Sequence, residues 1–346
     1  MRTRAGLPFN GQKTGLACVA VMASTLLVSA CHTSSVASGK SGQNVATSTA
    51  SAPTIALVLG GGGAKGFAHV GVIKALEANN IHPNLVVGTS VGSFVGSLYA
   101  SGKSTAELER IARTTADSEL TDFTLAYQGI IEGNKLRDFV NLQVNNQPIE
   151  AFPIRFGAVA AEKHSLAKTV FTQGEAGLAV QASSSVPNVF IAPRIPDPKT
   201  SGIVGKKYID GGVVSIVPVD SAKALGADIV IAVDLQINKN KNTSPSGIKD
   251  ANRSLWSLIE QGYNSYLNSS AKDSATQAYR QHYAAINEAE IGRADVVIRP
   301  DVANISAITT LDREKAIAAG AAATEQNLPA IRAAIAKAHV QYRLNN

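Results

Sequence analysis

The chain has 346 residues, 45% of them hydrophobic, and 32 Lys and Arg against 26 Asp and Glu. This composition is typical of a globular protein and excludes a chain that is disordered along its length. Three of the basic residues, Arg2, Arg4 and Lys13, precede the first structural boundary, so the rest of the chain has only a small basic excess. Since there are no basic runs with interleaved aromatics, the charge does not support a nucleic-acid binder.

Residues 1–30 predict an export signal. Positive charges are followed by an apolar stretch from Leu16 to Val28 and then by small residues before Cys31. The stretch LVSAC at 27–31 resembles the lipobox of bacterial lipoproteins, in which the cysteine is lipidated and becomes the first residue of the mature chain. An ordinary signal peptide with a chance cysteine is the alternative.

The residues around Cys31 lead to two further expectations. The other cysteine, Cys18, lies inside the segment that would be removed, so we expect no disulfide in the mature chain. By the same resemblance, His32 in place of aspartate implies an exported lipoprotein of the outer membrane that faces the periplasm. Residues 31–53 are rich in Ser, Thr, Gly and Ala and predict a flexible tether with a reach of roughly 25 Å.

From Thr54 onward, short β-branched runs alternate with longer helix-like segments, which predicts an α/β fold with a largely parallel sheet. A single domain, residues 54–346, is favoured because no linker like the N-terminal one recurs. A hairpin or loop is expected from Ile203 to Ile209. The predicted strands lie near residues 54–59, 84–88, 153–160, 168–172, 228–234 and 295–299.

The apolar periodicity also predicts helices. The first begins near Phe67 and ends at the Asn79-Asn80 pair, and the second runs from Val91 to Ala100 with Gly102 as a C-terminal cap. Residues 236–252 are polar and predict a loop. The C-terminal part, residues 250–346, is expected to be helical, with an amphipathic helix from Leu255 to Tyr283 and a terminal layer in the last forty residues.

Four glycines follow the first strand, in the sequence IALVLGGGGAKGFAHVGV at 55–72. Gly61, Gly63 and Gly66 satisfy the G-x-G-x-x-G pattern of dinucleotide sites. That interpretation requires an acidic residue about 20 positions further on, at the end of the second strand, where the chain has VVG at 86–88 instead. A Walker loop also fails, because Phe67 follows the last glycine. A second interpretation is that the loop directs backbone N–H groups at an oxyanion.

The second strand ends in GTSVG at 88–92, the pattern of a nucleophile elbow. Ser90 would occupy a tight strand-to-helix turn, and Gly88 and Gly92 would relieve the crowding there. Adjacent parallel strands present their C-terminal turns side by side, so the two glycine-rich turns are expected to meet. On this hypothesis the N–H groups around Gly61, Gly62 and Gly63 form an oxyanion hole. Lys65 is either a positive charge near an anionic head group or a solvated lysine.

A nucleophilic serine needs a base. None of the histidines that follow it, His164, His282 and His339, lies at a strand end of the kind that a catalytic triad uses. Asp210, in YIDGG at 208–212, leaves a strand-like run into a glycine turn, and a carboxylate can accept the serine proton if the two lie within hydrogen-bond reach. In isolation, Asp-Gly is also a common turn dipeptide.

The blocks GGGGAKG at 60–66, GTSVG at 88–92 and DGG at 210–212 resemble the three signature blocks of the patatin-like phospholipase family. The resemblance implies a three-layer α/β/α sandwich and a Ser-Asp dyad, with Ser90 as nucleophile, Asp210 as base, Gly211 in the base motif and the glycine loop as oxyanion hole. The segment ASSSVP at 182–187 is similar to the Ala-Ser-x-x-x-Pro segment of the family. The motifs cover residues 54–235, and the pattern extends to about residue 300.

The leading functional hypothesis is therefore a membrane-tethered serine hydrolase that cleaves acyl esters of phospholipids or lysophospholipids through an acyl-enzyme intermediate. No cofactor and no metal are expected, because there is no HExxH motif and no Cys/His ligand spacing. The expected partners are the lipid substrate and the membrane, and not nucleic acid. One alternative keeps the acyl-enzyme but uses another acceptor or substrate, such as a thioester, a small ester or an amide. The others are a nucleotide-binding module and a non-catalytic envelope scaffold.

Overall fold

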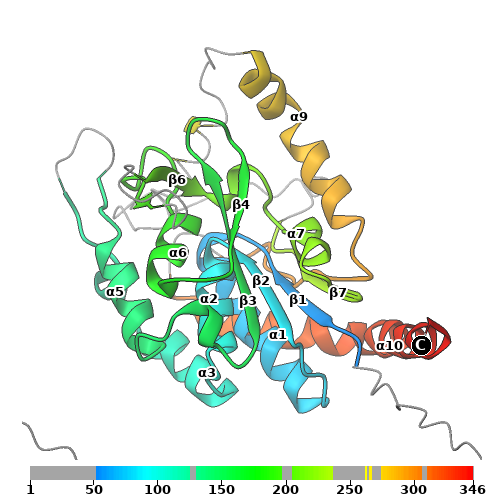
Figure 1. Cartoon of the computed structure of the whole chain (residues 1–346). Coiled ribbons are helices and arrows are strands. Elements are labelled where there is room, and N and C mark those ends of the chain that lie inside the picture. The colour runs from blue at the N-terminus through cyan, green and yellow to red at the C-terminus, as the bar shows by residue number, and fades with distance from the viewer. Residues whose placement is uncertain are drawn as a thin grey trace, which may run out of the picture. The chain divides into compact units, whose positions relative to one another are not determined.

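A mixed eight-stranded sheet lies at the centre of the computed structural model (Figure 1). The strand order is β5-β6-β3-β2-β1-β7-β8, and β4 pairs with β3 outside this path. The structure describes residues 52–124, 130–196, 205–236, 262, 265–266, 274–305 and 310–345. The predicted export signal, nearly all of the predicted tether, and residues 237–252 of the predicted loop lie outside the described residues.

The central strands are parallel, as the sequence predicts. β1 pairs in parallel with β2 and β7, β2 with β3, and β7 with β8. The pairs β3–β4, β3–β6 and β5–β6 are antiparallel. The strands are β1 (Ile55–Leu59), β2 (Leu85–Thr89), β3 (Arg155–Glu162), β4 (Lys168–Phe171), β5 (Arg194–Ile195), β6 (Lys206–Asp210), β7 (Ile229–Val233) and β8 (Val296–Ile298).

The six predicted strands are all confirmed. The continuous apolar runs form β1, β2, β7 and β8 in the parallel part of the sheet, where layers on both faces bury them. Every residue of β2 and β7 is buried. Within the expected hairpin or loop at 203–209, residues 206–209 belong to β6, which pairs antiparallel with the preceding strand β5 and with β3. The strand begins with the exposed Lys206 and the half-buried Lys207, and the strand-like run that precedes the glycine turn at 211 is its buried end.

Helices cover both faces of the sheet, and this arrangement makes the three layers (Figure 1). One face packs against α1, α2, α3 and α10, and the other packs against α7 and the end of α9. The helices are α1 (Phe67–Ala78), α2 (Val91–Ala100), α3 (Thr105–Thr114), α4 (Asp117–Leu120), α5 (Asn134–Gln143), α6 (Ala176–Ser183), α7 (Val219–Ala224), α9 (Ser274–Ile291) and α10 (Arg313–Asn345), with short 3₁₀ turns η1 (Gly63–Gly66), η2 (Ile149–Ala151) and η3 (Gly211–Val213).

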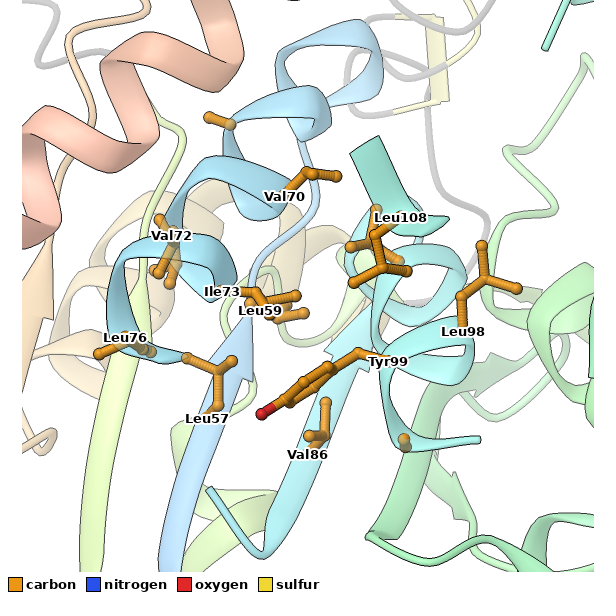
Figure 2. Close-up of a cluster of buried hydrophobic side chains, with 14 of the residues drawn as sticks. Leu57, Leu59, Val70, Val72, Ile73, Leu76, Val86, Leu98, Tyr99 and Leu108 are labelled. Carbon is orange, nitrogen blue, oxygen red and sulfur yellow. The ribbon is translucent and has the colours of Figure 1, made fainter. Parts of the chain in front are cut away.

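The larger core cluster lies between the sheet and the first helical layer (Figure 2). Leu57 and Leu59 of β1 meet Ile73 of α1, while Leu98 of α2 and Leu108 of α3 close the cluster from the other side. All five are at most 2% exposed. Burying each such side chain contributes about 2 kcal/mol relative to leaving it in water, so this layer fixes the helix that follows each central strand.

The terminal helix α10 confirms the predicted helical layer and crosses α1 at very short range. A Cβ at Gly71 of α1 would lie 1.9 Å from the carbonyl oxygen of Ile317, and one at Gly320 of α10 would lie 2.0 Å from that of Ala68. Only glycine allows the two backbones to approach so closely. In the described part of the chain, no helix is both long and apolar enough to cross a membrane.

The helix expected from Leu255 to Tyr283 is described only in part. Gly262 and the residues 265–266 are helical, and α9 continues eight residues beyond the predicted end, to Ile291. Polar residues in its last two turns hide this extension from the amphipathic pattern. Asn287 and Glu290 of the extension, and Tyr283 at the predicted end, point their polar atoms at the protein and not at water.

Candidate active site

Ser90 occupies the turn between β2 and α2. Its backbone has φ 55° and ψ −125°, a conformation that non-glycine residues rarely adopt and that is typical of strained functional turns. The turn is tight, because a Cβ at Gly92 would lie 2.0 Å from the carbonyl oxygen of Leu59 at the end of β1. The amide of Ser90 donates to Ser183 Oγ at 2.9 Å. Since α2 begins at the next residue, the half-buried Ser90 side chain lies at the positive, N-terminal end of that helix.

Asp210 is the last residue of β6 and is fully buried. Its Oδ1 accepts a hydrogen bond from the Gly212 amide at 2.7 Å. In the sheet register, Asp210 pairs with Ala160 of β3, while Thr89, the residue before the serine, pairs with the neighbouring Val159. The two predicted catalytic residues are 120 positions apart in the sequence. The structure places them on either side of β3, at the same end of that strand.

The segment 182–187 connects these two residues, a role that the sequence pattern did not assign to it. Ser183 Oγ accepts from the Ser90 amide and donates to the Val159 carbonyl at 2.6 Å. Two residues further on, the Ser185 carbonyl accepts from the Asp210 amide at 2.9 Å. The serines of this block therefore hold the backbones of both predicted catalytic residues.

The glycine loop lies beside the nucleophile turn. A Cβ at Gly61 would lie 3.5 Å from Ser90 Cβ, so the backbone of the loop passes close to the serine side chain. The structure corrects one member of the predicted oxyanion hole, because the Gly61 amide already donates to the Ile216 carbonyl at 2.9 Å. Among the described residues, the amides of Gly62 and Gly63 have no such acceptor. Lys65 lies half-buried in η1, directly after these glycines.

His69 is a buried residue of this site that the sequence reasoning missed, since only histidines after the serine were weighed. It lies on α1, and its Nε2 donates to the Gly60 carbonyl at 2.8 Å. Burial lowers its pKa from 6.5 to about 4, so the ring is neutral at pH 7. The signal in the sequence was a polar ring at position 69 in an otherwise apolar helix face, one turn after the glycine loop.

The three histidines that follow the serine in the sequence are all exposed. His282 lies on α9, His339 lies on α10, and His164 lies in the turn between β3 and β4. Within the described ranges, no group of three or more His, Cys, Asp or Glu side chains is arranged to hold a metal ion.

A pocket is lined by Ser90 and by Gly63 and Ala64 of the glycine loop. Helices α1, α2 and α3 contribute nine of the twenty lining residues, and all nine are apolar. They include Phe67, Val70, Val95, Leu98, Leu108 and Ile111. An apolar chain attached to a carbonyl group at the serine would fit this lining.

Comparisons with known proteins agree with this geometry. A sequence model of the family described as patatin-like phospholipase matches residues 57–223, a range that contains both Ser90 and Asp210. The chain is 33% identical over 211 residues to human patatin-like phospholipase domain-containing protein 6. This match covers 59% of this chain and 15% of the human protein. It is also 34% identical over 188 residues to an uncharacterised NTE family protein of Mycobacterium tuberculosis. That match covers 54% of this chain and 50% of the mycobacterial protein.

Among solved structures, the fold is similar to that of VipD from Legionella pneumophila, with a TM-score of 0.50 and 14% sequence identity. The match covers 80% of this chain and 67% of that one. At this identity the similarity concerns the fold alone. The chain spans half or less of the length of the curated relatives described above.

Proposed function

Because residues 57–223 belong to the patatin-like phospholipase family, we propose that this protein is a serine hydrolase that cleaves acyl esters of lipids through an acyl-enzyme intermediate. The observation that carries the proposal is the position of Ser90, which lines the apolar pocket and lies across the end of β3 from the buried Asp210. A nucleophile beside an apolar pocket suits a long acyl group better than a nucleotide, whose phosphates and sugar are polar.

In the proposed reaction, Ser90 Oγ attacks the ester carbonyl while Asp210 accepts the hydroxyl proton. The amides of Gly62 and Gly63 and the positive end of α2 stabilise the oxyanion that forms. Asp210 then returns the proton to the leaving alcohol as the carbon–oxygen bond breaks. Water, deprotonated by the same carboxylate, attacks the acyl-enzyme and releases the fatty acid, and the serine regains its proton.

The test combines turnover with covalent labelling of the full chain in detergent. We expect hydrolysis of fatty-acyl esters that EDTA does not change, and a fluorophosphonate adduct that peptide mass spectrometry places on Ser90. An active protein whose adduct lies on another residue, or activity that disappears with EDTA and returns with a divalent cation, would contradict the proposed chemistry.

The pocket makes a prediction about acyl-chain length. Val95 lines the pocket on α2, five residues after Ser90, or about 7.5 Å along the helix. Val95→Phe is expected to raise KM for a dodecanoyl ester about tenfold, because losing burial of about two methylene groups costs roughly 1.5 kcal/mol. KM for an acetyl ester should not change. The control is Val340→Phe on the exposed part of α10, and equal effects on both esters would argue against an acyl pocket.

We also propose that the chain is tethered to the outer membrane through a lipid on Cys31. The support for this is the lipobox-like LVSAC at 27–31 and the polar, small-residue segment after it. In a Gram-negative host, the protein should incorporate radioactive palmitate and sediment with membranes. Cys31→Ser should remove the label and shift most of the protein to the soluble fraction. Membrane sedimentation of unlabelled Cys31→Ser would contradict the lipid anchor.

A further inference from the structure

The loop that follows Asp210, residues 211–218, is held from outside by one face of α9. We call it the support loop. The Tyr283 hydroxyl donates to the Gly212 carbonyl, Asn287 Oδ1 accepts from the Ile216 amide at 2.8 Å, and Glu290 Oε2 accepts from Ser215 Oγ at 2.7 Å. Residues 283, 287 and 290 are spaced by four and three positions and so lie on the same side of the helix.

The same three residues of the support loop hold the predicted catalytic groups on its inner side. The Gly212 amide donates to Asp210 Oδ1. The Ser215 carbonyl accepts from Thr89 Oγ1 at 2.9 Å, next to the nucleophile. The Ile216 carbonyl accepts from the amide of Gly61 in the glycine loop. Each contact from α9 is therefore continued, through one loop residue, to the base, the nucleophile turn or the glycine loop.

Most of the residues that make these contacts are buried, so water cannot replace a hydrogen bond that they lose. Asn287 is 5% exposed, Glu290 is 3% exposed and Ser215 is fully buried. Glu290 Oε1 also accepts from Lys168 Nζ and from the Asp220 amide, both at 3.1 Å, so the carboxylate has three donors. A buried polar group that loses its hydrogen-bond partner therefore destabilises the fold. Sliding or rotating α9 would break several of these bonds together, so the polar face defines one position of the loop.

We propose that Tyr283, Asn287 and Glu290 of α9 are positioning residues for the reaction at Ser90. They hold the support loop so that the base, the nucleophile turn and the glycine loop keep their relative places. The inference rests on the proposed function, since it concerns the same site. A misplacement of about 1 Å caused from a distance can lower a rate by about 100-fold.

The experiment compares three glutamate variants in the full chain. Glu290→Ala removes the acceptors of the Ser215 hydroxyl, Lys168 and the Asp220 amide. Glu290→Gln has the same shape and can bond to all three groups. Glu288→Ala is the control on the same helix, because the Glu288 side chain is 70% exposed. The measurements are kcat and KM for a dodecanoyl ester, the rate at which a fluorophosphonate labels Ser90, and thermal unfolding.

We expect Glu290→Ala to lower kcat and the labelling rate about 10- to 100-fold, with KM within about twofold of wild type. Glu290→Gln should recover most of both rates, and Glu288→Ala should equal wild type. If Glu290→Ala does not fold, Tyr283→Phe, which removes one hydroxyl, replaces it and is expected to lower kcat about tenfold.

The positioning role would be overturned if a folded Glu290→Ala variant had the kcat of wild type. If Tyr283→Phe is used instead, a wild-type kcat in that variant would overturn it. So would a fall in Glu290→Gln as large as that in Glu290→Ala. Wild-type protein that shows no hydrolysis and no labelling of Ser90 would instead refute the proposed function itself. The two failures are thus distinguished by the wild-type measurement.

Discussion

Replacing Ser90 by alanine is expected to lower kcat for ester hydrolysis by at least about 10⁴-fold while leaving the fold unchanged. Alanine keeps the Cβ, so the strained turn is neither relieved nor worsened, and the backbone bond from residue 90 to Ser183 Oγ remains. Only the attacking oxygen is lost. The measurement is turnover of a dodecanoyl ester, with circular dichroism and thermal unfolding as checks of the fold.

The same series tests the base. Asp210→Asn can still accept the Gly212 amide with Oδ1 but cannot take the serine proton, so a fall of about 10⁴-fold is expected. Because the two groups act as a unit, the double variant should be no slower than the slower single variant. Asp228→Asn is the control, since Asp228 is exposed and accepts a backbone amide from Thr54 far from the serine. Additive losses, or an active Asp210→Asn, would exclude the dyad.

Acid is expected to destabilise the protein before its carboxylates are protonated, because of His69. The pKa of the buried ring is about 4 in the folded state and 6.5 in the unfolded state. Between these values the unfolded chain binds a proton that the folded chain does not. The stability that the neutral His69 ring contributes is therefore fully present above pH 6.5 and is lost as the pH falls towards 4. By linkage, this group alone lowers the free energy of unfolding by about 2 kcal/mol at pH 5 and about 3 kcal/mol at pH 4.

Urea unfolding between pH 7.5 and pH 5 measures this effect. The carboxyls with lowered pKa, such as Glu175 beside Arg137 and Asp220 beside Arg293, contribute stability that is lost only below about pH 5. His69→Gln keeps an amide N–H that can donate to the Gly60 carbonyl and has no proton to gain. Its stability should therefore be nearly constant over this range. A variant whose stability declines as steeply as that of wild type would show that the acid sensitivity arises elsewhere.

Much of the fold follows from local patterns that the tertiary structure did not have to override. The runs IALVL and IVIAV became the buried strands β1 and β7 because only a doubly covered strand hides apolar side chains on both sides. Helix α2 begins and ends at the predicted residues because it is set between a tight turn at Ser90 and a glycine with positive φ at 102. The strand-like run before Asp210 became the end of β6, but two lysines stand at the start of that strand, and its pairing with β3 is a long-range contact that no local pattern encodes.

The candidate site divides in the same way. The sequence by itself determined the chemical types, since an elbow serine, a glycine loop and an aspartate before a glycine turn are each encoded within a few residues. The tertiary structure alone decided which groups meet. It engaged the Gly61 amide with Ile216, placed His69 behind the loop, and set Glu290 of α9 against the support loop. Such partners lie many residues apart, and only the packing of the layers brings a buried polar group to the one neighbour that satisfies it.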